Sequence, residues 1–304
     1  SRTGRVARLF AHVDRPLLAM ARRDLDLRRL KEGDLVRLKT RRGAVVVEVE
    51  ASESVRPGQC FLPMHWGGRF MGGLGVNALT LPEFDPVSKQ PELKHAAAQV
   101  EKIELPWKMA VLVVGDGSAL LDAAQPLLRA CEYGAAGLAG RERDVMTLRL
   151  AHSGPVDPAL IAALDAALGL DDILNVLQYE DHPRGVSKRA RIRGGKIVAA
   201  RLTGETAAFD WLRDAIVEGA EVAKDGPASV RNWILAPVAQ APAGGVGRGR
   251  VVCNCRNVTE PEIVAAIARG ADLATLQGTL QCGSECGSCV PELKRLLAAK
   301  RAAA

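Results

Sequence analysis

The sequence has no long apolar stretch and few aromatic residues. None of its apolar runs is long enough to cross a bilayer as a helix, and its start does not resemble a signal peptide. Aromatic residues make up 4% of the 304 residues, and no stripe combines them with basic side chains. The net charge of +6 is spread along the chain, which argues only weakly for an acidic partner surface. We therefore expect no membrane or nucleic-acid partner.

Cysteine is present but unevenly distributed. Five of the seven cysteines lie within residues 253–304. An odd number with a tight terminal cluster fits a reducing cytoplasm and a metal site better than a disulfide framework. Because the first residue is Ser1 rather than Met, we also expect a piece of a longer protein.

The terminal cysteines form two close pairs. Cys253 and Cys255 make a C-x-C pair, and Cys286 and Cys289 make a C-x-x-C pair. Four thiolates in two pairs suit either a [2Fe–2S] cluster or a structural zinc ion, because each pair chelates from one short loop. Cys282 is a fifth candidate by spacing. The two remaining cysteines stand alone in apolar surroundings and are expected to be core or bystander residues: Cys60 and Cys131.

The first region, residues 1–105, has the pattern of a β-rich fold. Residues 35–40 and 45–50 alternate apolar and polar side chains, and a third short strand is expected at residues 60–63. Residues 64–77, which we call the glycine loop, are rich in glycine. Such backbone either turns sharply or approaches a ligand closely.

Residues 106–240, which we call the connector, change to a mixed α+β pattern. An apolar strand is predicted at 109–114 and a hairpin at 190–202. Three helices are predicted, at 118–131, 158–168 and 207–219. Residues 241–250 have the composition of a flexible linker.

Residues 251–304 form a small module, expected to be all-α. Thr259 and Glu262 have the spacing of a capping box, which predicts a helix that ends at Gly270. A second helix is predicted from near Asp272, and Pro291 suits the first turn of a third.

Two sequence resemblances make these regions more specific. Val252 to Cys255, Val258 to Glu260 and Cys286 to Leu293 resemble the bacterioferritin-associated-ferredoxin-like (BFD-like) domain. That resemblance implies a [2Fe–2S] cluster held by Cys253, Cys255, Cys286 and Cys289, with Cys282 outside the ligand set. Because of this resemblance we predict a [2Fe–2S] cluster rather than a zinc ion.

The first region is similar to the dinucleotide-binding domain of bacterial molybdopterin oxidoreductases, and nearest to nitrate reductases. The motifs that match in order are Thr3-Gly4-Arg5, Glu32 to Val36, Arg41 to Gly43, Leu62 to Trp66, Asn77 to Thr80 and Asp85 to Lys94. The resemblance implies a six-stranded double-psi barrel. It also implies dinucleotide contacts from Thr3, Arg5, Asn77 and Lys94, and places Met64, His65 and Trp66 near the substrate end. Without the resemblance, the chemistry of these residues would favour a turn-capping role for Asn77 and a solvated surface charge for Lys94.

Together the resemblances imply the C-terminal part of a nitrate reductase catalytic subunit that uses molybdenum bis(molybdopterin guanine dinucleotide). Electrons from a ferredoxin, a flavodoxin or an NADH-dependent flavoprotein would enter at the [2Fe–2S] module. The family's molybdenum ligand and [4Fe–4S] motif are not in this sequence. We therefore expect them in N-terminal domains of the same enzyme, and expect the chain alone not to reduce nitrate. Two alternatives stay open: an electron-transfer or cofactor-binding protein without catalysis, and a related molybdoenzyme such as a formate dehydrogenase.

Two further motifs favour plain structural explanations. Gly115-Asp116-Gly117 begins like a nucleotide-binding turn, but Leu120 stands where the third glycine of G-x-G-x-x-G is required. We interpret it as a turn between a strand and a helix. His182 lies in a polar stretch without a nucleophile or second acid placed by the sequence, so a surface loop is expected there.

Overall fold

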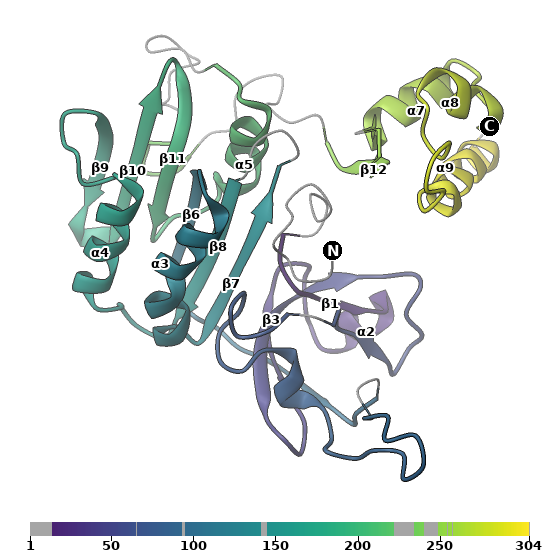
Figure 1. Cartoon of the computed structure of the whole chain (residues 1–304), viewed down its shortest axis with the longest axis horizontal. Coiled ribbons are helices and arrows are strands. Elements are labelled where there is room, and N and C mark those ends of the chain that lie inside the picture. Colours follow the sequence, from purple (N-terminus) through teal and green to yellow (C-terminus); the bar gives the residue numbers. More distant parts are fainter. Residues whose placement is uncertain are drawn as a thin grey trace.

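The structure is a computed structural model, shown in Figure 1. It describes residues 14–64, 66–92, 95–140, 145–221, 234–239, 249–253, 255–256 and 258–303. The described elements form two large sheets, one in the first region and one in the connector, followed by a small module with three helices and a two-stranded sheet. None of the helices in these ranges is long and apolar enough to cross a bilayer.

The first region holds a five-stranded sheet in the order β4-β1-β3-β2-β5. Its elements are β1 (Leu17–Met20), α2 (Arg22–Leu27), β2 (Leu35–Lys39), β3 (Ala44–Ala51), β4 (Cys60–Phe61), the 3-10 helix η1 (Val76–Leu79) and β5 (Gln99–Lys102). Strands β1 and β3 pair in parallel and the other pairs are antiparallel. The alternation in β2 and β3 turns Val36, Leu38, Val45, Val47 and Val49 into the core.

The β-rich character expected of this region is confirmed. The described residues contribute five strands to the sheet, so the six-stranded double-psi barrel stays a prediction. Cys60 lies exposed in β4.

The connector holds a six-stranded antiparallel sheet in the order β7-β8-β6-β11-β10-β9. Its elements are β6 (Trp107–Val114), α3 (Gly117–Ala130), β7 (Tyr133–Ala139), β8 (Val145–His152), α4 (Pro158–Leu168), β9 (Val176–Asp181), η2 (His182–Arg184), β10 (Val186–Arg193), β11 (Lys196–Thr203) and α5 (Phe209–Glu218). Strand β8 lies between β6 and β7, which run in the same direction. This arrangement is the split β-α-β unit of ferredoxin-like folds.

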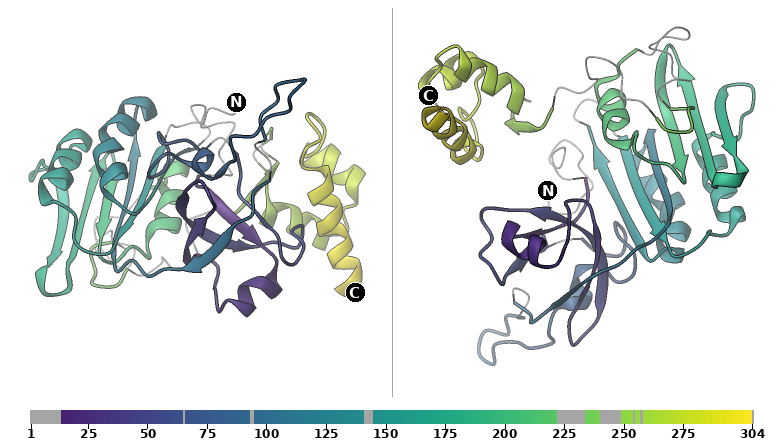
Figure 2. Two further views of the ribbon diagram at one scale, coloured as in Figure 1. Left: turned by 90° about the horizontal axis from the view of Figure 1, so that it is seen from below. Right: turned by 180° about the vertical axis from the view of Figure 1, so that it is seen from behind.

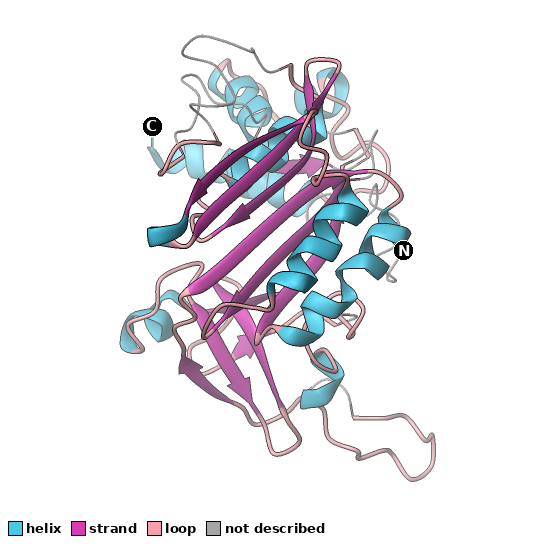
Figure 3. Ribbon diagram, turned by 90° about the vertical axis from the view of Figure 1, so that its left-hand side faces the viewer, coloured by secondary structure: helices cyan, strands magenta, loops and turns pink. Residues whose placement is uncertain are grey.

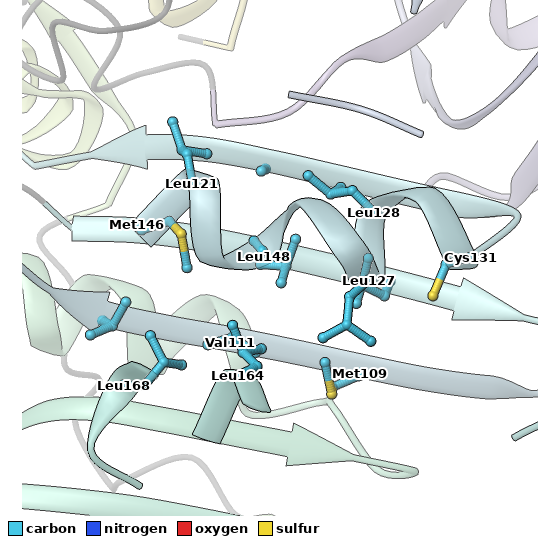
Figure 4. Close-up of a cluster of buried hydrophobic side chains, with 14 of the residues drawn as sticks. Met109, Val111, Leu121, Leu127, Leu128, Cys131, Met146, Leu148, Leu164 and Leu168 are labelled. Atoms are coloured by element: carbon cyan, nitrogen blue, oxygen red, sulfur yellow. The ribbon is translucent and has the colours of Figure 1, made fainter. Parts of the chain in front are cut away.

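The helices of the connector cover both faces of its sheet. Figure 3 shows α3 and α4 together on one face, where they enclose an apolar core. Figure 4 shows side chains from α3, including Leu121 and Leu127, meeting Val111 and Leu148 of the sheet. Cys131 belongs to this core, as expected from its apolar surroundings. Helix α5 covers the other face through a second core that includes Leu212.

A buried polar network joins the first sheet to the connector. The Tyr133 hydroxyl at the start of β7 donates to Glu48 of β3 at 2.6 Å, and the Arg15 Nε donates to the same carboxylate at 2.9 Å. Arg213 of α5 donates to Asp14 at 3.0 Å. Despite the burial of Asp14, the neighbouring arginines, Arg15 first, hold the pKa of its carboxyl below the usual value. The two regions therefore share buried charges.

The C-terminal module is not all-α as predicted, because the residues on either side of Cys255 pair as a short hairpin. Its elements are β12 (Val251–Cys253), β13 (Val258–Thr259), α7 (Glu260–Ala268), α8 (Leu273–Thr279) and α9 (Val290–Ala303). The capping box is present, since the Thr259 amide and hydroxyl both donate to Glu262 at 2.8 Å. Asp272 caps α8, as expected. Figure 2 shows these helices to one side of both sheets. Most of the expected linker, residues 241–248, lies outside the described residues.

Candidate functional site

The first cysteine loop is the connection between β12 and β13. Cys253 is the last residue of β12 and pairs with Val258, so Cys255 lies in the tight connection between the strands. The Glu260 amide donates to the Arg250 carbonyl at 2.7 Å, which closes the base of the hairpin. The hairpin therefore fixes both thiols relative to the start of α7.

The second cysteine loop leads into α9. Cys286 lies in the loop, and Cys289 directly precedes the helix, where its carbonyl accepts from the Leu293 amide at 3.0 Å. Gly287 between them has a φ of +70°, a conformation that glycine adopts without strain. The dipole at the start of α9 favours negative charge on sulfur there.

The fold brings the two loops together in cross-loop cysteine pairs. Cys255 Sγ lies 3.2 Å from Cys286 Sγ, and the Cys289 thiol shares a hydrogen bond with Cys253. The Cys253 and Cys289 pair is buried, with 2% and 6% of each residue exposed. Cys286 is exposed and Cys255 is half-buried. The four predicted ligands thus form an inner and an outer pair.

The outer and inner pairs differ electrostatically. A hydrogen bond with the Ser288 hydroxyl, 3.0 Å away, is the main cause that lowers the pKa of Cys286 to about 7. Burial, with a smaller contribution from Cys253, raises the pKa of Cys289 to about 12. A metal centre must displace these protons, because thiolates and not thiols ligate metals.

The donor set consists of four thiols in two cross-loop pairs, each with one member from either loop. Within the described ranges, no group of three or more histidine, cysteine or acidic side chains is arranged to hold one metal ion. Four thiolates are the ligand set of a [2Fe–2S] cluster and also of a structural zinc ion. The choice between the two stays a prediction.

Cys282 stands apart from the two pairs. Its side chain is fully buried in the apolar core of the module, and its thiol donates to the Leu276 carbonyl at 3.4 Å. Burial raises the pKa of this thiol, as it does that of Cys289. Its place outside the two cross-loop pairs agrees with the predicted ligand set, which stays a prediction.

One ion pair beside the outer cysteines was not predicted from the sequence. Arg256 follows Cys255 and lies 2.6 Å from Glu285, which precedes Cys286. Both side chains are largely exposed, so the pair contributes little to stability. Its effect is to place one charge of each sign at the solvent-facing edge of the cysteine loops.

The predicted dinucleotide contacts are only partly described. Thr3, Arg5, His65 and Lys94 lie outside the described residues. Asn77 lies in η1 with an exposed side chain, and its carbonyl accepts from the Thr80 hydroxyl at 3.0 Å. Among the described residues its side-chain amide has no hydrogen-bond partner, and an amide offers both a donor and an acceptor.

The two described residues of the expected substrate end differ in burial. Met64 is 44% exposed. Trp66 is partly buried, and its ring meets that of Phe70 edge to face with centroids 6.3 Å apart. Trp66 packs against both the core of the first sheet and a connector core. Its position is therefore fixed by both regions.

The two further motifs have the structural roles expected of them. Asp116 caps α3, since its carboxylate accepts from the Ser118 amide at 2.9 Å. The side chain of Asp116 therefore occupies the start of the helix, where a nucleotide phosphate would bind. A side chain at position 117 would overlap the side chain of Leu138, so packing accounts for the glycine there. His182 is exposed in η2.

Comparisons with known proteins identify two domains. Residues 1–97 match the family model of the molybdopterin dinucleotide binding domain, and residues 251–299 match that of the BFD-like [2Fe-2S] binding domain. Over its whole length the chain is 32% identical to a nitrate reductase of Klebsiella oxytoca, of which it covers 33%.

Two further relatives match over shorter stretches. A nitrate reductase of Synechocystis sp. is 42% identical over 65 residues, which are 21% of this chain and 9% of that protein. An F420-dependent formate dehydrogenase 1 subunit alpha of Methanococcus maripaludis is 39% identical over 74 residues, 24% of this chain and 10% of that protein. The chain spans a third or less of the length of each of these relatives.

Proposed function

The chain contains a molybdopterin dinucleotide binding domain and a BFD-like [2Fe-2S] binding domain, and from this premise we propose that it is the C-terminal part of a molybdenum-dependent nitrate reductase. We assign residues 1–105 to a dinucleotide-binding barrel, 106–240 to the connector, 241–250 to a linker and 251–304 to the cluster module. The similarity to a nitrate reductase extends over the whole chain, connector included, and this observation carries the proposal.

The residues of the module have the chemistry that the proposal needs. Cys253, Cys255, Cys286 and Cys289 would hold the [2Fe–2S] cluster, which supplies one-electron transfer when bound. The apolar core behind the inner pair keeps water from two of the thiolates, while the outer pair faces solvent. We infer that the electron donor, a ferredoxin, a flavodoxin or an NADH-dependent flavoprotein, docks at the outer edge.

The first region would hold the pterin guanine dinucleotide. The cofactor supplies the two-electron reduction of nitrate to nitrite when it carries molybdenum. Asn77 and Lys94 would donate hydrogen bonds to its polar edges and phosphates, with Thr3 and Arg5 as further contacts. The molybdenum ligand and a [4Fe–4S] cluster would come from N-terminal domains of the same enzyme, so the chain alone would lack activity.

The ligand assignment can be tested on this chain by substituting each cysteine of the module. Cys253→Ser, Cys255→Ser, Cys286→Ser and Cys289→Ser should each lower iron and sulfide well below the two of each expected per chain. Cys282→Ala is the matched control, and should keep both. Electron paramagnetic resonance of the reduced chain should show an S = 1/2 signal. One zinc per chain without sulfide would overturn the redox assignment and leave a structural zinc site.

The substrate needs a separate experiment, because one observation favours a second candidate. The similarity of a 74-residue stretch to a formate dehydrogenase subunit is compatible with formate oxidation. The longer protein containing this chain should reduce nitrate with a reduced viologen dye and should not oxidise formate. Formate oxidation without nitrate reduction would select the second candidate. Loss of both, with cofactors bound, would favour an electron-transfer or cofactor-binding protein.

A further inference from the structure

The glycine loop is closed at its neck by its own backbone. Gly67 and Gly75 form an antiparallel bridge, and the Val76 amide donates to the Trp66 carbonyl at 2.9 Å. Gly75 has a φ of +73°, and a side chain there would overlap Trp66 and Gly67. The neck therefore brings the two ends of the loop together, and the Gly67 carbonyl accepts from the Phe70 and Met71 amides at 2.9 and 3.2 Å within it.

The connector supplies contacts to those residues. Strand β7 is the outermost strand of the connector sheet, and its free edge faces the loop. The Gly72 amide donates to the Gly134 carbonyl at 2.9 Å, and the Ala136 amide donates to the Phe70 carbonyl at 2.7 Å. The bridge between Met71 and Ala135 completes the pairing. The loop thus acts as a short added strand of the connector sheet.

Successive side chains of this added strand enter different cores. Phe70 is 7% exposed and belongs to the core under α3 and α4. Met71 is 1% exposed and belongs to the core of the first sheet. Side chains that alternate along a strand point to opposite faces, so one extended segment reaches both cores.

Helix α3 holds the residue before Phe70. The Gln125 amide donates to the Arg69 carbonyl at 2.8 Å. The Arg69 guanidinium donates to the Ser118 hydroxyl at 3.0 Å and lies 3.0 Å from the Asp122 carboxylate. Residues 69–72 are therefore bound by both β7 and α3.

We propose that the connector is a positioning element of the dinucleotide site, in which β7 and α3 fix the course of the glycine loop. This inference rests on the proposed function, because it takes the loop to face the cofactor. Glycine-rich backbone loses much conformational freedom when it is ordered, and the contacts from the connector offset that loss before any ligand arrives. Gln125 is then a positioning residue that acts on the cofactor through the backbone of Arg69.

The test compares Gln125→Ala with Gln178→Ala, a matched control on the exposed side of β9. Both are made in the longer, cofactor-loaded protein. Molybdenum and the guanine nucleotide released by acid are measured before and after gel filtration. Hydrogen exchange of residues 66–76 and the thermal midpoint of unfolding are measured on the same samples. We expect Gln125→Ala to speed exchange at residues 69–72 and to retain about threefold less nucleotide. Its iron content should match the control, and so should its thermal midpoint once both variants have been stripped of nucleotide.

A second variant acts on the strand itself. Ala136→Pro removes the amide that donates to Phe70, and that amide points to the free edge of β7 rather than to β8. Ala136→Pro should retain less nucleotide than Gln125→Ala. If Ala136→Pro fails to fold, the comparison of Gln125→Ala with its control decides the test.

The outcomes separate this inference from the proposed function. Unmutated protein without molybdenum or guanine nucleotide would overturn the proposed function and with it this inference. Nucleotide in the unmutated protein, retained equally by Gln125→Ala and its control, would overturn the inference alone.

Discussion

Cys286 and Cys289 are three residues apart, yet their thiols lie in different surroundings. Cys286 is exposed and close to a hydroxyl, whereas Cys289 lies in the core of the module. The sequence predicted both as ligands of one centre from their spacing. It did not predict which would face solvent, because that depends on how the hairpin and α9 pack.

Ser288 provides a test at this scale. Its hydroxyl lies 3.0 Å from Cys286 Sγ, and a donor to a ligating sulfur stabilises the reduced cluster. Ser288→Ala should therefore lower the midpoint potential of the bound [2Fe–2S] cluster. A bond that is stronger by about 1 kcal/mol in the reduced than in the oxidised state corresponds to about 40 mV for one electron. Potentiometric titration followed by electron paramagnetic resonance measures the shift.

Two variants control that experiment. Ser284→Ala removes a hydroxyl of the same loop that donates to the Gln281 carbonyl, and it should leave the potential unchanged. Ser288→Thr keeps the hydroxyl and should restore the original potential. An equal shift in Ser284→Ala and Ser288→Ala would show that the loop, and not the hydroxyl, sets the potential.

The buried Tyr133 hydroxyl gives a stability prediction at the same scale. Tyr133→Phe removes its bond to Glu48 but leaves the Arg15 partner of that carboxylate. We expect the free energy of unfolding to fall by about 1.5–3 kcal/mol, as for a hydrogen bond to a charged group. Urea denaturation measures it, with Tyr179→Phe as the control, because the 3.4 Å contact of Tyr179 with Asp181 is long and half-buried.

The same tyrosine predicts a dependence on pH. Burial first, and then the Glu48 carboxylate, raise the pKa of Tyr133 well above its usual value. The unfolded chain releases that proton near pH 10, while the folded chain keeps it. The contribution of Tyr133 to stability is therefore complete below about pH 10 and is lost as the pH rises further. The difference between the unmutated chain and Tyr133→Phe should shrink from pH 8 to about pH 10.5.

At the scale of elements, the sequence predicted well where one pattern dominates. The alternation in β2 and β3, the apolar run of β6 and the caps of α7 and α8 gave strands and helices close to those observed. Strand β7 was missed, because Tyr133–Ala139 is made largely of alanine and glycine and has no alternation. All seven of its residues are buried, so tertiary packing and not local preference makes it a strand.

The missed strand also hid part of the site. Without β7, nothing in the sequence links Phe70 or Arg69 to the connector, and Gln125 is an ordinary helical glutamine. The contacts of the glycine loop depend on a pairing between residues more than sixty positions apart. Only the folded arrangement reveals them.

The neck of the glycine loop gives a prediction for this element. Gly73 and Gly75 both have positive φ, at +68° and +73°, but only at Gly75 would a side chain overlap the backbone of the loop. Gly73→Ala should cost roughly 1–2 kcal/mol of unfolding free energy through φ alone. Gly75→Ala should cost clearly more, and urea unfolding compares the two. Equal costs would show that the neck relaxes to admit a side chain.

At the scale of the whole molecule, residues 241–250 join the connector to the module, and most of them lie outside the described residues. We propose that residues 242–249 let the cluster module move between its electron donor and the enzyme. Deleting part of this segment should slow nitrate reduction driven by the protein donor and spare reduction driven by a small dye. Steady-state rates with both reductants test this, and a linker of equal length with scrambled order is the control. Equal loss with both reductants would contradict the proposal.

Phe70 and Met71 have a consequence for how the protein melts. Adjacent residues of one segment lie in two cores, so neither core can open without withdrawing a side chain from the other. The first sheet and the connector should therefore unfold as one cooperative unit and give a single calorimetric transition, although each has a sheet of its own. A protein in which another spacer replaced the connector would leave Phe70 without the core that it packs into. We therefore expect the first region and the connector to occur together in related proteins.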